Sequence, residues 1–138
     1  MMSSFDRMAV SLGKNIAEVQ ETIKEADKPH KIEGPRFERT VYLFQSVIKS
    51  LIDIGNRIII ENDLRDPLNT ADVFISLAEH GLIPPSIVPG VKKAAIQTTK
   101  IRDLEKSEVL QLMTDCINDM NRCLVLFKTH YEQKPSVD

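Results

Sequence analysis

Apolar residues recur at alternating spacings of three and four along most of the chain, which is the pattern of amphipathic helices. Ser3 or Ser4 can cap the first of these segments, and Asp6 suits the positive end of a helix dipole. We therefore predict a first helix that ends near residue 26. Its predicted buried stripe consists of Phe5, Met8, Leu12, Ile16, Val19, Ile23 and Ala26.

The second segment, from about Pro35 to Asn62, has two adjacent apolar stripes, which predict a helix buried on more than one side. Gly55 interrupts this helix at a cost of about 1 kcal/mol relative to alanine, and a closely packed neighbouring backbone would offset that cost. The stripes contain Phe37, Val41, Phe44, Ile48, Leu51, Gly55 and Ile58, widened by Leu43, Val47, Ile54 and Ile59. The remaining polar face contains Gln45, Lys49, Asp53, Asn56 and Arg57.

Turn-forming residues divide the next part of the chain. A short helix is predicted to begin at a cap formed by Asn69 or Thr70 and to end before Gly81, which suits the left-handed position after a helix. Pro85 suits the first turn of the following helix, which we expect to continue to about residue 101. Pro89 is expected to kink that helix or to delay its regular start.

The longest uninterrupted stripe begins near Ser107 and predicts a long final helix. Its apolar positions are Val109, Met113, Cys116, Met120, Cys123 and Phe127, reinforced by Leu110, Ile117 and Leu124. The alternating pattern of a β-strand occurs nowhere in the sequence. Four main helices with one short additional helix predict an all-α, up-and-down four-helix bundle.

Length and composition fit one ordinary domain. The 138 residues allow a single core, which we assign to residues 1–134, with residues 135–138 as a disordered tail. The net charge of −2 provides no global basic surface, so any contact with RNA must be local. Because the sequence has neither a charged-then-apolar leader nor an apolar run of roughly 18 residues, we expect a cytoplasmic protein with no membrane partner.

Few residues offer chemistry of their own. Cys116 and Cys123 lie about 10 Å apart along one predicted helix, too far for a disulfide, so we expect both in the core of a protein from a reducing compartment. His30, His80 and His130 lack the spacing and the Cys or carboxylate neighbours of a metal site. Because the sequence has no glycine-rich phosphate loop or nucleophile elbow either, we predict no metal and no cofactor.

Two consecutive blocks resemble a known family. Residues 39–62 read RTVYLFQSVIKSLIDIGNRIIIEN, and residues 63–84 read DLRDPLNTADVFISLAEHGLIP. The first is similar to the second helix of the HepT-like branch of the HEPN proteins, except that Arg57 stands where the family usually has His. The second is similar to the Leu-Arg-x-Pro, Ala-Asp-Val-Phe and Gly-x-Ile-Pro motifs of that branch. The combined string is specific, although each piece alone is weak.

This resemblance implies a HEPN-like helical bundle that pairs into a dimer. Near the dimer interface of such proteins, an Arg, four residues and a His form a metal-independent ribonuclease site. There the His moves the proton of a ribose 2′-hydroxyl and the Arg holds the phosphate. In many such systems the protein is a toxin whose partner is a minimal nucleotidyltransferase, and a Tyr two residues after the His receives AMP.

That ribonuclease motif is missing here. Counting from the anchor KKAA at residues 92–95 places Thr98 at the Arg position, Asp103 at the His position and Glu105 at the Tyr position. An aspartate is a poor general base at neutral pH. We therefore predict no catalytic residue by the family mechanism, and the sequence leans towards a protein that is not an enzyme.

Two polar groups are candidate contacts for a partner or for RNA, namely Asp53, Asn56 and Arg57 in the second helix and Lys100, Arg102 and Asp103 before the last helix. The alternative for the first group is a solvated polar face. The alternative for the second group is an ordinary charged surface, because neighbouring acids dilute its cations. The resemblance places the first group beside the region of the lost active site.

These observations favour a HepT-like homodimer that acts as a non-catalytic interaction protein, the degenerate toxin-type component of a nucleotidyltransferase toxin–antitoxin system. We expect a dimer because the second helix has more apolar surface than one neighbouring layer can cover, and because Gly55 permits close approach of another backbone. A monomer that leaves Val47 or Ile54 exposed would contradict this expectation.

Two other functions stay open from the sequence. One is a metal-independent RNA endonuclease whose rearranged site lies around Lys100, Arg102 and Asp103. The other is an RNA-binding or structural dimer, for which weak and strongly salt-dependent RNA binding is expected.

Overall fold

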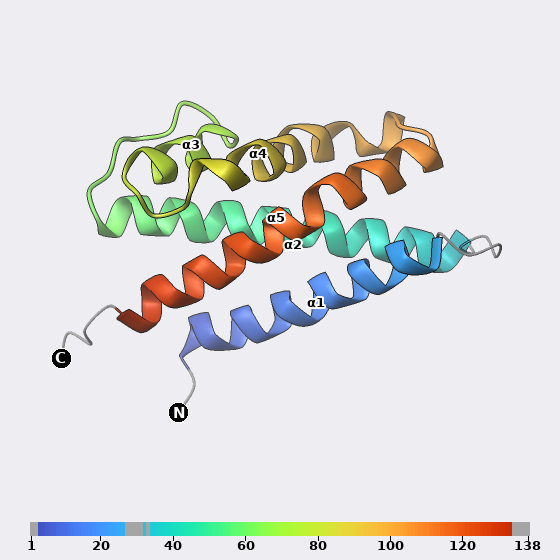
Figure 1. Ribbon diagram of the computed structural model, residues 1–138, viewed down its shortest axis with the longest axis horizontal. Helices are drawn as coiled ribbons and strands as arrows, with labels where there is room; N and C mark the ends of the chain where they lie inside the picture. The colour runs from blue at the N-terminus through green and yellow to red at the C-terminus, as the bar shows by residue number, and fades with distance from the viewer. Residues whose placement is uncertain (1–2, 27–31, 33, 134–138) are drawn as a thin grey trace.

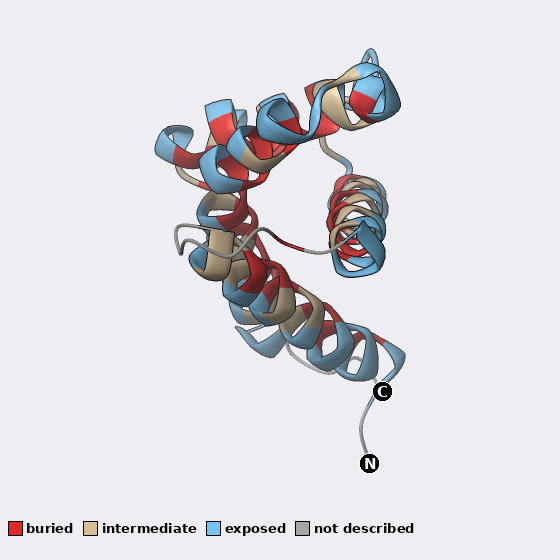
Figure 2. Cartoon of the chain, turned by 90° about the vertical axis from the view of Figure 1, so that its right-hand side faces the viewer, coloured by how far each residue is buried: buried red, intermediate tan, exposed pale blue. Residues whose placement is uncertain are grey.

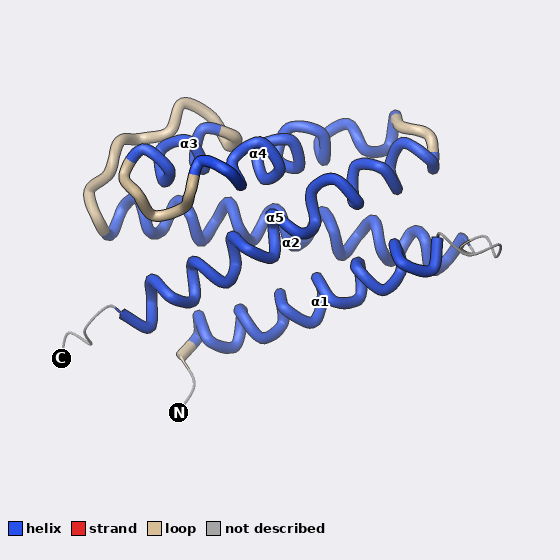
Figure 3. The backbone as a smooth tube through the Cα atoms, in the orientation of Figure 1, coloured by secondary structure: helices blue, strands red, loops and turns tan. Residues whose placement is uncertain are grey.

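The computed structural model describes residues 3–26, 32 and 34–133 and is helical through most of them (Figure 3). No strand occurs in these residues, which confirms the predicted all-α class. The tail expected at residues 135–138 and His30 lie outside the described residues. The elements are α1 (Ser4–Ala26), α2 (Gly34–Glu61), α3 (Asp72–Glu79), the 3-10 helix η1 (Pro85–Ile87), α4 (Val88–Gln97), the 3-10 helix η2 (Thr98–Asp103) and α5 (Lys106–Gln133).

The long helices run alternately in opposite directions, in the order α1, α2, α4 and α5, and the short α3 lies over one end of α2 (Figure 1). Helix α5 packs against both α1 and α4, and α2 packs against α1, α3 and α5. Their buried side chains form one core cluster, which lies on the inward faces of the helices (Figure 2). The predicted up-and-down bundle with a short additional helix is confirmed.

The first turn of α1 is held by a reciprocal pair of hydrogen bonds. The Asp6 backbone N–H donates to Ser3 Oγ, and the Ser3 N–H donates to the Asp6 carboxylate, each at 3.1 Å. This is the cap that the sequence predicted. One core position was wrong, because Met8 is 40% exposed whereas Ala9 is buried. The buried stripe includes Phe5 and Ala9, which are four residues apart and share one face of the helix. Met8 lies beside this face and points towards solvent.

Helix α2 is covered on several sides by its own chain. Val47 is fully buried and Ile54 is 3% exposed. A Cβ atom on Gly55 would lie 2.7 Å from Val73 Cγ1 and 3.1 Å from Leu77 Cδ1, so this glycine is closely packed, but by side chains and not by the neighbouring backbone that was predicted. The neighbour, however, is α3 of the same chain. The apolar width of α2 and Gly55 therefore give no reason to expect a dimer, because α1, α3 and α5 of the same chain bury those positions.

The segment between α3 and α5 departs from one regular helix. Gly81 has φ +75° after α3, as expected for a left-handed position that ends a helix. Pro89 lies in the first turn of α4, and the preceding turn is the 3-10 helix η1, so the proline delays the regular start. The helix expected to reach about residue 101 ends at Gln97, and η2 continues the chain with a tighter winding.

An ion-pair cluster closes the connection from α2 to α3. The Arg65 guanidinium donates to Asp72 at 2.8 and 3.0 Å and to Glu79 at 2.9 and 3.3 Å. The Asp72 carboxylate also accepts the Leu68 backbone N–H at 2.8 Å, and the Ser76 hydroxyl donates to the Arg65 carbonyl at 2.6 Å. Arg65, helped by this backbone N–H, lowers the pKa of Asp72 to about 2. Two residues of the family-like motifs thus have a structural role.

Helix α5 buries the predicted stripe, including both cysteines, which are free thiols. Burial raises the pKa of Cys116 to about 11 and raises the pKa of Cys123 further. Because the thiolate is the reactive species, both side chains are inert apolar residues in the folded protein.

Candidate functional site

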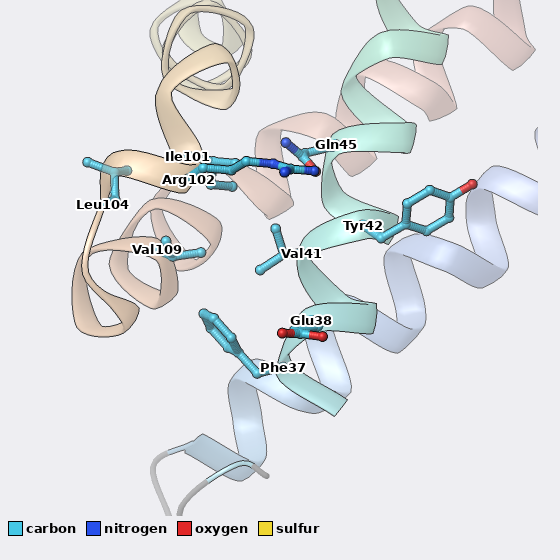
Figure 4. Close-up of a pocket in the computed structure, with 9 residues that line it drawn as sticks. All are labelled: Phe37, Glu38, Val41, Tyr42, Gln45, Ile101, Arg102, Leu104 and Val109. Atoms are coloured by element: carbon cyan, nitrogen blue, oxygen red, sulfur yellow. The ribbon is translucent and has the colours of Figure 1, made fainter. Parts of the chain in front are cut away.

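A pocket of about 520 Å³ opens between α2, η2 and the start of α5 (Figure 4). Its wall is mixed: apolar side chains from α2, η2 and α5 lie beside polar groups from α2 and η2. Convergent polar groups in a concave, partly apolar surface make it a candidate binding site. The lining residues are Phe37, Glu38, Val41, Tyr42, Gln45, Ile101, Arg102, Leu104 and Val109.

Helix η2 positions Arg102 at this pocket. Ile101 is buried against the core, so its neighbour Arg102 must project from the surface. The Gln45 side-chain amide donates to the Thr98 carbonyl at 3.4 Å, which ties the start of η2 to α2. The Arg102 side chain extends from η2 across the pocket towards Gln45 (Figure 4). Among the interactions described, it makes no ion pair.

The charges at the pocket are mixed. Arg102 is the cation and Glu38 is the carboxylate of the lining residues. Beside the pocket, the Lys106 ammonium lies 5.1 Å from the centre of the Phe37 ring and donates to the Ile32 carbonyl at 2.7 Å. Lys106 thus fixes one wall by a cation–π contact and a hydrogen bond.

The other two candidate residues of η2 point elsewhere. Lys100 lines a second groove, between η2, α4 and the start of α3. Asp103, the last residue of η2, is exposed and is not among the lining residues of either pocket. The structure therefore brings Arg102 alone of the three into the pocket.

The candidate residues of α2 lie further along that helix. Arg57 is twelve residues beyond Gln45, about 18 Å along the axis. Its guanidinium pairs with Glu61 at 3.2 Å and lies 5.6 Å from the centre of the Tyr131 ring. Asp53 is exposed and Asn56 is half-buried on the same helix. The two candidate groups are not brought together into one pocket.

Arg57 belongs to a cluster that joins the ends of three helices. The Tyr131 hydroxyl donates to the Glu61 carboxylate at 3.0 Å, and the Tyr131 ring packs 4.3 Å from the ring of Phe5. Burial, together with the Glu61 carboxylate, raises the pKa of Tyr131 to about 12. Through these contacts Arg57 connects α2 to α5.

The positions of the family-like nuclease motif do not face one site. Thr98 begins η2, and its Oγ1 atom is buried without a hydrogen-bond partner among the described residues. Asp103 lies five residues later and is exposed. In a 3-10 helix, residues three apart share a face, so Thr98 shares its face with buried Ile101 and Asp103 points away. Among the pocket residues there is no histidine.

The two histidines in the described part of the chain make local contacts. His80 Nδ1 lies 2.8 Å from the Ser76 carbonyl, and the His130 ring makes an edge contact with Tyr131. No group of three or more His, Cys, Asp or Glu residues able to hold a metal ion occurs in the described part of the chain. None of the helices described is long and apolar enough to cross a membrane.

The sequence did not identify most of the pocket. Phe37, Val41 and Val109 were predicted on apolar stripes, and together with Ile101 they form part of the pocket wall where η2 meets α2. Tyr42 could have been identified as a pocket residue from the sequence, because it is an aromatic residue on the predicted polar face of α2. The structure shows its side chain to be 67% exposed.

Solved structures of nearly equal length share this fold, among them the following three. A mutant of the toxin–antitoxin MntA–HpeT is 19% identical, with 91% of this chain and 97% of that chain covered and a TM-score of 0.77. The tri-AMPylated HEPN toxin of Shewanella oneidensis, in complex with an MNT antitoxin, is 18% identical, with 94% and 99% covered and a TM-score of 0.74. YutE of Bacillus subtilis, a cytosolic protein of unknown function, is 13% identical, with 93% and 94% covered and a TM-score of 0.69.

At these identities the likeness shows the fold. The chain has the fold of the HEPN toxins, as its resemblance to the HepT-like branch implied. No family model and no curated protein matches the sequence.

Proposed function

We propose that this chain is the toxin-type component of a nucleotidyltransferase toxin–antitoxin pair and acts as a non-catalytic interaction protein. The observation that carries the proposal is the likeness, over 94% of this chain, to a HEPN toxin solved in complex with an MNT antitoxin. The resemblance of residues 39–62 and 63–84 to the HepT-like branch supports the same assignment from the sequence. These residues form most of α2 and all of α3 and include the Arg65–Asp72 pair.

The chemistry of η2 supports a protein without ribonuclease activity. Cleavage of RNA at a 2′-hydroxyl needs a proton acceptor and a phosphate clamp directed at the same site. Thr98 and Asp103 supply neither group, and they face different directions. Glu105 at the position of the AMP-accepting Tyr likewise removes the acceptor for that modification.

A partner test addresses the interaction role. The chain is co-expressed with the minimal nucleotidyltransferase encoded next to its gene, with only the nucleotidyltransferase tagged. We expect co-purification at a fixed ratio. Failure of the two proteins to bind, or the lack of any such neighbouring gene, would overturn the toxin–antitoxin assignment.

The competing function is a ribonuclease with a rearranged site, which the exposed guanidinium of Arg102 in the pocket favours. Purified protein is incubated with transfer RNA and messenger RNA, with and without a chelator. We expect no cleavage. Cleavage that Arg102→Ala abolishes would establish the nuclease instead and would contradict the non-catalytic assignment.

A further inference from the structure

A second groove, separate from the Arg102 pocket, runs between α4 with η2 on one side and the start of α3 on the other. Its volume is about 410 Å³. We call it the lysine groove, because two lysines are among its lining residues. The lining residues are Leu68, Asn69, Thr70, Ala71, Asp72, Ile75, Lys92, Ala95, Ile96, Thr99 and Lys100.

One wall of the lysine groove is a helical stripe. Lys92, Ala95, Ile96, Thr99 and Lys100 follow the spacings of three and four that place side chains on one face. The stripe therefore presents a lysine at each end with small and apolar side chains between them. Lys100 follows Lys92 by eight positions along α4 and η2, about 12–14 Å along the axis.

The groove is apolar between these cations and open to solvent. Leu68 is 88% exposed and Ile96 is 41% exposed, so two large apolar side chains of the groove are in contact with solvent. Ile75 is half-buried on the facing wall. These side chains would gain free energy from burial by a partner.

The charge of the groove is positive. Its one carboxylate, Asp72, is held by two hydrogen bonds from Arg65 and is therefore already paired. Lys92 and Lys100 are exposed and form no ion pair among the described residues, in contrast to Lys93, which binds Asp115 at 2.8 Å. Lys92 is near enough to Asp72 to contribute to its lowered pKa, although Arg65 is the main cause. An occupant that carries carboxylates would therefore complement the groove.

The lining favours a peptide over RNA. Single-stranded RNA is held by aromatic side chains that stack on its bases, and the residues of the lysine groove include no aromatic ring. An extended peptide rises about 3.3 Å per residue, so two carboxylates about four residues apart match the lysine spacing.

We propose that the lysine groove binds an acidic amphipathic segment of a partner protein, in which two carboxylates flank apolar side chains. The carboxylates pair with Lys92 and Lys100, and the apolar side chains cover Ile96 and Leu68. This inference rests on the proposed interaction role, since it names the chemistry of the segment that the partner inserts.

The test is a selection from a library of random short peptides displayed on phage, followed by fluorescence anisotropy of one enriched peptide and of its amide analogue. We expect enriched sequences with acidic residues on both sides of apolar residues. Lys92→Glu/Lys100→Glu should weaken binding about ten-fold or more. The matched control, Lys14→Glu/Lys24→Glu on α1, makes the same change of net charge away from the groove and should change binding less than about two-fold.

Several outcomes would overturn the proposal. These are enrichment without acidic residues, equal weakening by the control pair, or an RNA gel shift that the groove variant abolishes while no peptide is enriched. Binding of the nucleotidyltransferase separates this proposal from the proposed function. If the nucleotidyltransferase binds the groove variant and the parent equally, the groove proposal is wrong and the proposed partner is retained. If acidic peptides bind the groove but the nucleotidyltransferase does not bind the chain, the groove proposal is retained and the proposed partner is wrong.

Discussion

At the scale of single residues, two glycines on long helices have opposite surroundings. Gly55 of α2 lies against α3, where an added Cβ would meet Val73 at 2.7 Å, whereas Gly13 of α1 has no heavy atom within 4 Å of that position. The sequence places Gly55 on a predicted buried stripe and Gly13 outside one. It does not show that the neighbour packed against Gly55 is α3 of the same chain.

The expected effect of alanine differs in sign between these sites. Gly55→Ala should destabilise the protein by about 1–2 kcal/mol, because the cost of overpacking exceeds the gain in helix propensity. Gly13→Ala is the control and should stabilise it by about 0.5–1 kcal/mol. Urea denaturation followed by circular dichroism measures both. A stabilising Gly55→Ala would show that α3 does not pack as described.

Asp72 makes the stability of the folded protein sensitive to low pH. Its pKa is lowered to about 2 by Arg65, below the ordinary value of an unfolded aspartate near 3.9. The stabilising contribution is therefore fully present above about pH 4 and is lost as the pH falls towards 2. Thermal unfolding over that range should show a loss of stability that is smaller in Asp72→Asn, which is less stable than the parent at neutral pH. Equal acid sensitivity of the two proteins would contradict the pairing.

At the scale of elements, the limits of sequence reasoning follow from geometry. The stripes of α2 and α5 predicted buried faces because periodicity reports which side of a helix is apolar. The stripes do not show which neighbour covers the apolar face. A second copy of the chain was therefore predicted at Gly55, where α3 of the same chain lies. The end of α4 at Gln97 also escaped prediction, since residues 98–103 carry no proline or glycine that would end a helix.

The anchoring of η2 should control the Arg102 pocket. Gln45→Leu removes the hydrogen bond to the Thr98 carbonyl while keeping a side chain of similar size. We expect faster amide hydrogen exchange in residues 98–103 and little change in the middle of α5, because a local contact is lost and the core is not. Exchange that rises equally throughout the bundle would indicate global destabilisation instead.

At the scale of the whole molecule, the fold was predictable and the site was not. Helix number, order and class depend on local patterns, whereas the pocket is made where η2 meets α2, residues more than fifty positions apart. Candidate residues chosen by local charge, such as Arg57, proved to be tied into the bundle ends by Tyr131 and Glu61.

The oligomeric state stays a prediction at this scale. Light scattering at micromolar concentration should give at least twice the chain mass of 15.6 kDa. Since Val47 and Ile54 are buried within one chain, a dimer must use other surface. Tyr42 and Ile60 are exposed on α2 and are candidates for such an interface. A monomeric mass for the parent would refute the dimer, and an unchanged dimeric mass for Tyr42→Glu/Ile60→Glu would place the interface elsewhere.

The contact between Phe5 and Tyr131 also has a consequence for the order of folding. It joins the first turn of α1 to the last turn of α5, which lie more than one hundred residues apart in the sequence. Helices α1, α2 and α4 all pack on α5, so their apolar faces are covered only when that distant helix docks. Because contacts of such sequence separation close a long loop, we expect the docking of α5 to be the slow step of folding.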